Sequence, residues 1–190
     1  MNKKKYTIAQ ILPALNNGGV ERGVVEISKA LVDNNFRSIV ISSGGHMVPQ
    51  IIRNGGIHYE LDVHTKNPLK WSKIRSELKS VLEGENVDLI HFCSRAPAWI
   101  GLPLGAILDI PIITSVHMRL RKSNIFKKYY NSILTKGNFI IAISKHIESS
   151  INNSFPHVSG KIKVIHRGVD LDLFNPNNIN PARIISQSKH

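Results

Sequence analysis

The sequence contains 190 residues, of which 42% are hydrophobic, 20% are charged and one, Cys93, is a cysteine. This balance suits one globular domain with its own core, and the single thiol excludes a disulfide framework and fits a reducing cytoplasm. The net charge of +12 at pH 7 is compatible with nucleic acid, an anionic membrane or a phosphorylated substrate as partner.

The N-terminus begins with a basic run, Met1 to Lys5, and a short apolar segment at residues 6–12 follows it. That segment runs into Pro13 and a glycine turn rather than into a small-residue cleavage site. It is therefore interpreted as a first strand and not as a signal peptide. No apolar run in the sequence has the length that a bilayer span needs.

Strand and helix patterns alternate along the rest of the chain. The sequence predicts strands at residues 6–12, 37–43, 57–61, 87–93, 110–117, 138–144 and 161–168. It predicts helices at residues 20–35, 47–56, 67–85, 96–109, 123–137 and 145–155. The local signals that support the helices are Asn67, Ser123 and Ser144 as N-caps, Pro68 at a first helical position and Pro103 as a point of irregularity.

This alternation predicts an α/β fold, a Rossmann-like doubly wound parallel sheet of about seven strands. We expect residues 1–174 to form this domain. Residues 175–190 are rich in Asn and Pro and have no clear period, so they are interpreted as a tail or as a linker to a further domain.

The turn after the first predicted strand contains Gly18 and Gly19 and leads directly into a helical pattern. Ligands of doubly wound sheets bind at such turns, at the carboxyl ends of the strands. Glycines can take positive φ and let a phosphate approach backbone N–H groups at the positive end of a helix. A flexible connection explains the same residues. Neither a G-x-G-x-x-G fingerprint nor a P-loop is present, which points to another nucleotide-using class.

Two further predicted strand ends carry polar residues. Arg95, after residues 87–93, can clamp a phosphate or carboxylate with its planar guanidinium. His91 and Cys93 share one face of that strand, but too few ligands accompany them for a zinc site, and Cys93 is interpreted as a core residue. His117 ends the strand at residues 110–117, beside Arg119, and can hydrogen-bond a sugar hydroxyl, or hold a phosphate when protonated.

The charge is unevenly distributed. Between Asp109 and Glu148 there are seven Lys or Arg residues and no acidic residue, and apolar and aromatic side chains interleave with them at residues 123–137. Such a helix can lie on an anionic membrane surface. A helix that packs on the core and exposes a solvated basic face has the same pattern.

Five motifs occur in one order along the chain: ILPALNNGGVERGVVEISKAL, HFCSRAPAWIGL, ITSVH, AISKHI and KVIHRGVDLDLFNP. Together they resemble the N-terminal half of GT4-type glycosyltransferases, over residues 6–176. The last motif is the most specific and is similar to the IPNGVD…F.P segment that ends the first domain in that family. The resemblance implies the GT-B fold, in which two Rossmann-like domains face each other across a cleft.

The resemblance also implies an activity, which is the transfer of a sugar with retention by a hexosyltransferase-type enzyme. The implied donor is a UDP- or GDP-sugar, and the implied acceptor is lipid-linked or a polysaccharide. Such reactions belong to lipopolysaccharide or polysaccharide biosynthesis. It implies no cofactor and no metal, and His117 at the reaction centre as the catalytic residue. The residues expected beside the donor phosphates and the acceptor are Gly18, Gly19, Arg95 and Arg119.

The resemblance implies a cytoplasmic protein that is peripherally bound to the inner face of the membrane. The side chains expected to face a membrane or another anion are Arg121, Lys122, Lys127 and Lys128.

The chain departs from the family pattern because it stops at His190, where the second domain of such enzymes begins. That domain carries most donor contacts, including the two glutamates of an E-x7-E motif. We therefore expect either a fragment of a longer enzyme or a truncated gene product, inactive alone, with the missing C-terminal domain as its partner.

Two other functions stay open. A nucleotide-sugar epimerase shares the GT-B architecture, although the GGVER loop and the GVDLDLF ending favour the transferase. A basic nucleic-acid-binding or membrane-binding module would explain the net charge. The aromatic content of 6% and the lack of a recognition helix argue against a nucleic-acid partner.

Overall fold

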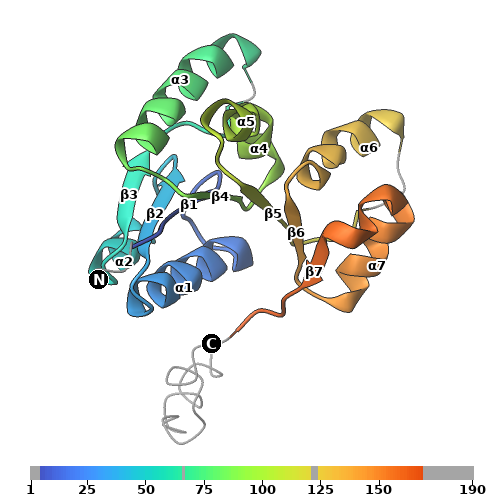
Figure 1. Ribbon diagram of the computed structural model, residues 1–190, viewed down its shortest axis with the longest axis horizontal. Coiled ribbons are helices and arrows are strands. Elements are labelled where there is room, and N and C mark those ends of the chain that lie inside the picture. Colours follow the sequence, from blue (N-terminus) through green and yellow to red (C-terminus); the bar gives the residue numbers. More distant parts are fainter. Residues whose placement is uncertain (1–4, 66, 121–123, 169–190) are drawn as a thin grey trace, which may run out of the picture.

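The computed structural model describes residues 5–65, 67–120 and 124–168. Within this part of the chain, seven strands form one parallel sheet in the order β3-β2-β1-β4-β5-β6-β7, which confirms the predicted fold class (Figure 1). The predicted linker at residues 175–190 lies outside the described residues. The strands are β1 Thr7–Ile11, β2 Arg37–Ser42, β3 Ile57–Glu60, β4 Leu89–Phe92, β5 Ile112–Val116, β6 Phe139–Ala142 and β7 Ile162–Val164.

Helices connect the strands, and Figure 1 shows α1 and α2 on one face of the sheet and α3, α4 and α5 on the opposite face. The predicted helix at residues 96–109 divides into α4 and α5 at Pro103, as expected. The helices are α1 Gly19–Asp33, α2 Val48–Arg53, α3 Pro68–Gly84, α4 Arg95–Gly101, α5 Pro103–Leu108, α6 Ile125–Ser132 and α7 Lys145–Ser154, with 3-10 turns η1 Ile133–Thr135 and η2 Pro156–Lys161.

Side-chain caps fix the starts of three helices. The Asn67 side chain accepts a hydrogen bond from the Leu69 amide at 3.0 Å, and Ser144 caps α7 in the same manner, which confirms both predicted caps. Ser123 lies outside the described residues. The cap of α6 is Asn124, whose side chain accepts from the Lys127 amide at 3.1 Å. The local sequence therefore sets where these helices begin.

The core has two parts, one on each face of the sheet. Side chains alternate along a strand, so Ile39 and Ile41 of β2 point to one face while Val40 points to the other, and all three are fully buried. The larger part includes Phe92 of β4 and Leu78 of α3. The smaller part packs under α1 and α2. Burial on both faces explains why the strands have near-continuous apolar sequences.

The two loops that follow β1 and β2 are joined by backbone hydrogen bonds. The Leu15 amide donates to the Gly44 carbonyl at 2.8 Å, and the Met47 amide donates to the Leu15 carbonyl at 3.0 Å. Gly45 has a φ of 137°, and a Cβ there would lie only 2.5 Å from the Leu15 carbonyl carbon. A residue with a side chain would be strained at this φ, and its Cβ would clash with the Leu15 carbonyl group.

Among the described residues, no helix combines the length and the hydrophobicity that a membrane crossing requires.

The packing of α4 against the sheet generates a stability prediction. A methyl group added at Gly101 would lie 2.8 Å from Phe92 Cζ and 2.9 Å from Leu78 Cδ2, so Gly101→Ala should lower the free energy of unfolding by about 1–3 kcal/mol. A matched control is Gly84→Ala at the end of α3, where nothing lies within 4 Å. That substitution should be neutral or stabilising by up to about 1 kcal/mol. Denaturant unfolding measures both, and equal effects would contradict the close packing of α4.

Candidate functional site

The strand order reverses between β1 and β4. These two strands pair in parallel, with Ile11 beside Phe92, but α1 follows β1 onto one face of the sheet and α4 follows β4 onto the other (Figure 1). Connections that leave neighbouring strands in opposite directions open a crevice at the carboxyl edge of the sheet. The predicted glycine turn and the polar residues after β4 and β5 belong to this edge.

A cavity of about 480 Å³ lies on the α1 side of this point. Its apolar wall comes from α1 and β6, including Val24 and Ile141. Its polar wall brings together residues from β4, β5, α1 and the segment after β7, which are far apart in the sequence. These polar-wall residues are Gly23, His91, Cys93, Ser115, His117, His166, Arg167 and Gly168.

His91 and Cys93 form the floor of the cavity. His91 Nε2 lies 2.6 Å from Ser115 Oγ, so this ring is held by a hydrogen bond to the neighbouring strand. Burial, and then the charge of His117, lower the pKa of His91 to about 4. Burial raises the pKa of the Cys93 thiol to about 12, so a thiolate nucleophile is excluded at neutral pH and the side chain behaves as a small core residue.

His117 contributes buried polar atoms with unused hydrogen-bonding capacity to this wall. Both of its ring nitrogens are buried, and neither has a partner among the described residues. Burial, and then the charge of Arg167, lower its pKa to about 4. The imidazole is therefore neutral at pH 7 and offers one donor and one acceptor, which suits a hydroxyl group. The predicted alternative, a protonated His117 that holds a phosphate, does not fit this pKa at neutral pH.

The glycine turn does not use the positive φ that glycine permits. Gly18 is extended, with φ 170° and ψ 163°, and Gly19 is the first residue of α1. The positive-φ glycines among the described residues are Gly44, Gly45 and Gly55. Close approach explains these glycines instead, because a Cβ at Gly19 would lie 2.7 Å from Arg167 Nη1. Gly18 has no side chain to cap α1, and the Glu21 carboxylate of the first turn lies beside Gly18.

Arg95 lies outside this cavity. It is the first residue of α4, and its Nη1 donates to Asn131 Oδ1 at 2.6 Å while the guanidinium stands 5.5 Å from the centre of the Tyr130 ring. Arg95 thus joins α4 to α6. The structure does not bring it together with His117, because α4 leaves β4 toward the opposite face.

Arg119 lines a separate hollow of about 650 Å³, formed with α7 residues that include His146 and Ser149. It follows His117 closely in the chain, yet it does not line the cavity that holds that histidine. Of the other predicted cations, Arg121 and Lys122 lie outside the described residues. Lys127 and Lys128 are exposed on α6, and Lys128 Nζ lies 5.8 Å from the centre of the Phe155 ring.

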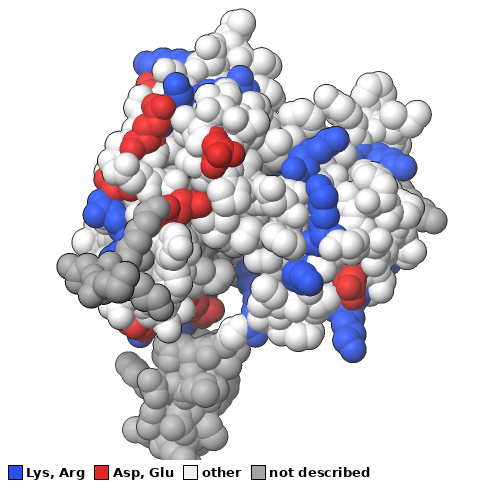
Figure 2. Space-filling view, in the orientation of Figure 1, with Lys and Arg blue, Asp and Glu red and all other residues white. Residues whose placement is uncertain are grey.

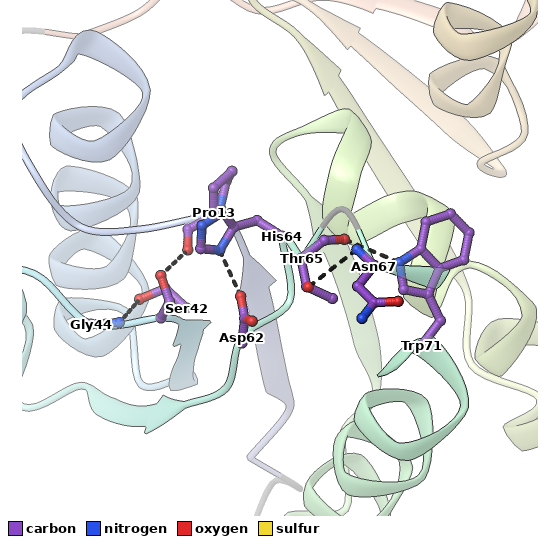
Figure 3. Close-up of polar contacts among 9 residues, drawn as sticks. Pro13, Ser42, Gly44, Asp62, His64, Thr65, Asn67 and Trp71 are labelled. Carbon is purple, nitrogen blue, oxygen red and sulfur yellow. Dashed lines mark hydrogen bonds and ion pairs between the residues drawn. The ribbon is translucent and has the colours of Figure 1, made fainter. Parts of the chain in front are cut away.

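The other half of the carboxyl edge carries a second polar group, shown in Figure 3. His64 Nδ1 lies 3.1 Å from Asp62 Oδ1 in the loop after β3, and both side chains are about half exposed. Ser43 Oγ donates to the Pro13 carbonyl at 2.7 Å, which ties the loop after β2 to the end of β1. Trp71 Nε1 donates to the Thr65 carbonyl at 3.0 Å and so fixes the loop before α3.

Sequence reasoning missed Arg167, His64 and Asp62. The signal for Arg167 was present, since it stands in the motif after the last strand, where the resembled pattern has an asparagine. Asp62 and His64 follow a short strand, but only the tertiary structure shows that the two side chains meet. Among the described residues, no group of three His, Cys, Asp or Glu side chains has the geometry to hold a metal ion.

Comparison with known proteins places this geometry in context. The sequence model of Glycosyltransferase Family 4 matches residues 17–173. Spore coat protein SA of Bacillus subtilis (strain 168) is 28% identical over 122 residues, which cover 64% of this chain and 30% of that protein.

Solved structures agree with the family match. The crystal structure of a glycosyltransferase from Rickettsia africae ESF-5 is 35% identical, with a TM-score of 0.82, and the match covers 98% of this chain and 49% of that one. Anabaena Alr3699/HepE, solved in complex with UDP-glucose, is 17% identical with a TM-score of 0.78 over 96% of this chain and 49% of that one, a likeness of fold alone. The chain therefore spans about half the length of these solved relatives, and their N-terminal half has the same sheet.

The two depressed histidine pKa values predict a pH dependence of stability. His91 and His117 titrate near 4 when folded and near 6.5 when unfolded, so the unfolded chain binds more protons between these pH values. The free energy of unfolding should therefore fall as the pH drops from 6.5 toward 4, by up to about 3 kcal/mol for His91. Denaturant unfolding at several pH values measures the slope. His117→Gln should flatten it, and an unchanged slope would contradict a buried neutral His117.

Proposed function

The chain belongs to Glycosyltransferase Family 4, and on this premise we propose that it is the acceptor-side domain of an enzyme that transfers a sugar from a nucleotide-sugar donor to a lipid-linked or polysaccharide acceptor with retention. The observation that carries this proposal is the cavity at the strand-order reversal. There, the buried and unpartnered ring nitrogens of His117 lie beside the uncapped start of α1. The UDP and UDP-glucose complexes of structural neighbours support a nucleotide-sugar donor.

The residues of the cavity suit positioning and charge stabilisation. A neutral His117 can donate one hydrogen bond to a sugar hydroxyl and accept another, which fixes the orientation of the reacting sugar. The open amides of α1, including those of Gly19 and Val20, can stabilise negative charge on the leaving phosphate. That phosphate can take the proton of the acceptor hydroxyl. On this proposal the reaction uses the donor as co-substrate and needs neither a cofactor nor a metal.

The second polar group supports an acceptor subsite. The Asp62–His64 pair lies in the connection from β3 to α3, and β3 is the third strand from β4 in the sheet order. An extended acceptor such as a glycan chain can contact this group as well as the crevice. The Asp62–His64 pair and the Trp71 ring provide hydrogen-bonding groups and an apolar face for sugar rings.

The His117 assignment predicts a large loss of activity. In the enzyme that carries this domain, His117→Ala should lower turnover by about two orders of magnitude or more, because it removes hydrogen bonds at the reaction centre. The measurement is transfer of labelled sugar from UDP- or GDP-sugars to lipid and polysaccharide acceptors. His157→Ala, in the exposed turn η2, is the control and should keep normal turnover. Near-normal turnover of the His117 variant would remove this residue from the site, and wild-type protein without transfer from any donor would overturn the function.

A membrane location is the second part of the proposal, and α6 carries it. On this eight-residue helix the exposed fractions of Ile125, Phe126 and Tyr129 are 83%, 81% and 66%. Lys127 and Lys128 lie between them in the sequence. Figure 2 shows that Lys and Arg dominate the half of the molecule that carries α6 and α7, whereas Asp and Glu gather on the half with α1, α2 and α3. Exposed aromatic and aliphatic side chains among cations suit an anionic lipid surface.

This location fits a lipid-linked acceptor. The helix α6 is the next helix after β5, so its first residues and His117 belong to the same connection. A membrane against α6 would hold a lipid-linked acceptor near the crevice. We accordingly propose a cytoplasmic enzyme that is peripheral at the inner face of the membrane.

Vesicle binding tests the α6 surface. Each lysine near an anionic membrane contributes about 1 kcal/mol, so Lys127→Gln with Lys128→Gln should weaken binding to phosphatidylglycerol-containing vesicles about tenfold or more. Phe126→Ser should weaken it separately through lost apolar burial. The control is Lys70→Gln with Lys73→Gln on α3, which makes the same change in net charge on the opposite half. Co-sedimentation with vesicles measures the binding of all these variants. An equal loss of binding in the α3 control would show that net charge alone attracts the protein and that α6 is not the contact surface.

A further inference from the structure

The chain contains the tripeptide Asn-Gly-Gly twice, at residues 17–19 and at residues 54–56. Asparagine is a thermolabile residue, and it is most labile before a glycine. The backbone nitrogen of the glycine can attack the side-chain amide carbon of the asparagine, and glycine has no Cβ to obstruct that approach. Because the three residues are the same at both places, the fold decides how far their reactivities differ.

The fold protects the second copy. Asn54 is the C-cap of α2, and Gly55 has a φ of 80° and donates its amide to the Ile52 carbonyl at 3.0 Å. The amide of Gly56 donates to the Ile51 carbonyl at 2.9 Å. These bonds close the end of the helix in the left-handed turn that glycine favours. Attack by the Gly55 nitrogen would require this turn to open.

The first copy is open to attack. Asn17 and Gly18 are both exposed in the loop between β1 and α1. The Gly18 carbonyl accepts the Arg22 amide at 3.1 Å, but within the part of the chain that the structure describes the Gly18 amide donates no hydrogen bond. No helical turn therefore has to open before this nitrogen reaches the Asn17 side chain.

Two neighbouring side chains suit a reaction at Asn17. His46 Nε2 lies 2.7 Å from Asn17 Oδ1. An amide oxygen only accepts hydrogen bonds, so the His46 ring is the donor. This bond stabilises the negative charge that develops on the oxygen during attack. The Glu21 carboxylate lies beside Gly18 and can take the proton of the attacking nitrogen.

We propose that Asn17 is a site of spontaneous deamidation and that His46 promotes the reaction. The Gly18 nitrogen gives up its proton and forms a bond to Asn17 Cγ, the bond from Cγ to Nδ2 breaks, and ammonia leaves with a proton in place of the one given up. The product is a succinimide ring. Water then opens the ring at either carbonyl, which gives an aspartyl or an isoaspartyl residue at position 17. The reaction needs only water, and it is independent of the proposed function.

The modification would change the edge of the crevice. Both products place a carboxylate in this loop, and the isoaspartyl product also adds a methylene group to the backbone between Leu15 and α1. Leu15 is tied to the loop after β2, because its amide donates to the Gly44 carbonyl at 2.8 Å and its carbonyl accepts the Met47 amide at 3.0 Å. The added length therefore has to be accommodated at the start of α1.

Peptide mass spectrometry tests the site on the 190-residue chain after incubation at neutral pH. In the folded protein, Asn17 should deamidate about tenfold or more faster than Asn54, because attack at Asn54 first breaks the hydrogen bond of the Gly55 amide. In denaturant the two sites should react at similar rates, since the protecting turn is lost. Equal rates in the folded protein, or a faster reaction at Asn54, would overturn the proposal.

Two variants test the mechanism. His46→Ala should slow deamidation of Asn17 by about three- to tenfold, the effect of one hydrogen bond, and leave the rate at Asn54 unchanged. His157→Ala, at an exposed position in η2, is the matched control and should leave both rates unchanged. Asn17→Gln should abolish the reaction at this position, because its longer side chain would have to close a larger ring. An unchanged or higher rate in His46→Ala would overturn the role of His46.

Sugar transfer by the enzyme that carries this domain measures the consequence for function. On incubation, the wild type should lose turnover in proportion to its isoaspartyl fraction, whereas Asn17→Gln should keep its own starting value. Equal losses in both proteins would overturn this consequence, and the mass spectra would still decide the modification. A wild type without transfer before incubation would overturn the proposed function and leave the deamidation result readable.

Discussion

The reversal of strand order between β1 and β4 is the constraint on which the rest of the structure depends. Right-handed crossovers force α1 and α4 onto opposite faces once β1 and β4 are neighbours. The edge between them then has no helix directly above it, and side chains from several strands meet there. The cavity beside α1, with His91 and His117 on its wall, is a direct consequence. The same divergence sends Arg95 away toward α6.

Burial determines the chemistry of this cavity. Desolvation keeps His91 and His117 uncharged at neutral pH, and it keeps Cys93 protonated. Charge on the cavity lining comes from Arg167 and from Lys29, Glu26 and Asp33 of α1. The cavity therefore places uncharged histidines beside charged side chains of both signs.

His117 in the cavity wall follows β5, which ends at Val116, and α6, which begins at Ile125, is the next helix along the chain. The contact between Trp99 Nε1 and the Tyr130 carbonyl, at 3.2 Å, and the Arg95–Asn131 hydrogen bond hold α6 against α4. This docking leaves Ile125 and Phe126 exposed at the first turn of the helix. A helix that is held in place and still exposes apolar side chains is suited to contact another surface without changing its own fold.

The sequence by itself determined the order and type of the elements, because apolar periodicity, caps such as Asn67 and Ser144, and breaks such as Pro103 act locally. It also indicated the strand ends that hold His91 and His117. Tertiary structure decided which of the polar residues meet, since Arg167 reaches Gly19 only through the path of the chain after β7, while Arg95 and Arg119 turn to other partners. It also decided the conformation of the glycine turn. Local sequence permits positive φ at Gly18, but this residue is extended, and the close approach of Glu21 to Gly18 and of Arg167 to Gly19 leaves little space for a Cβ.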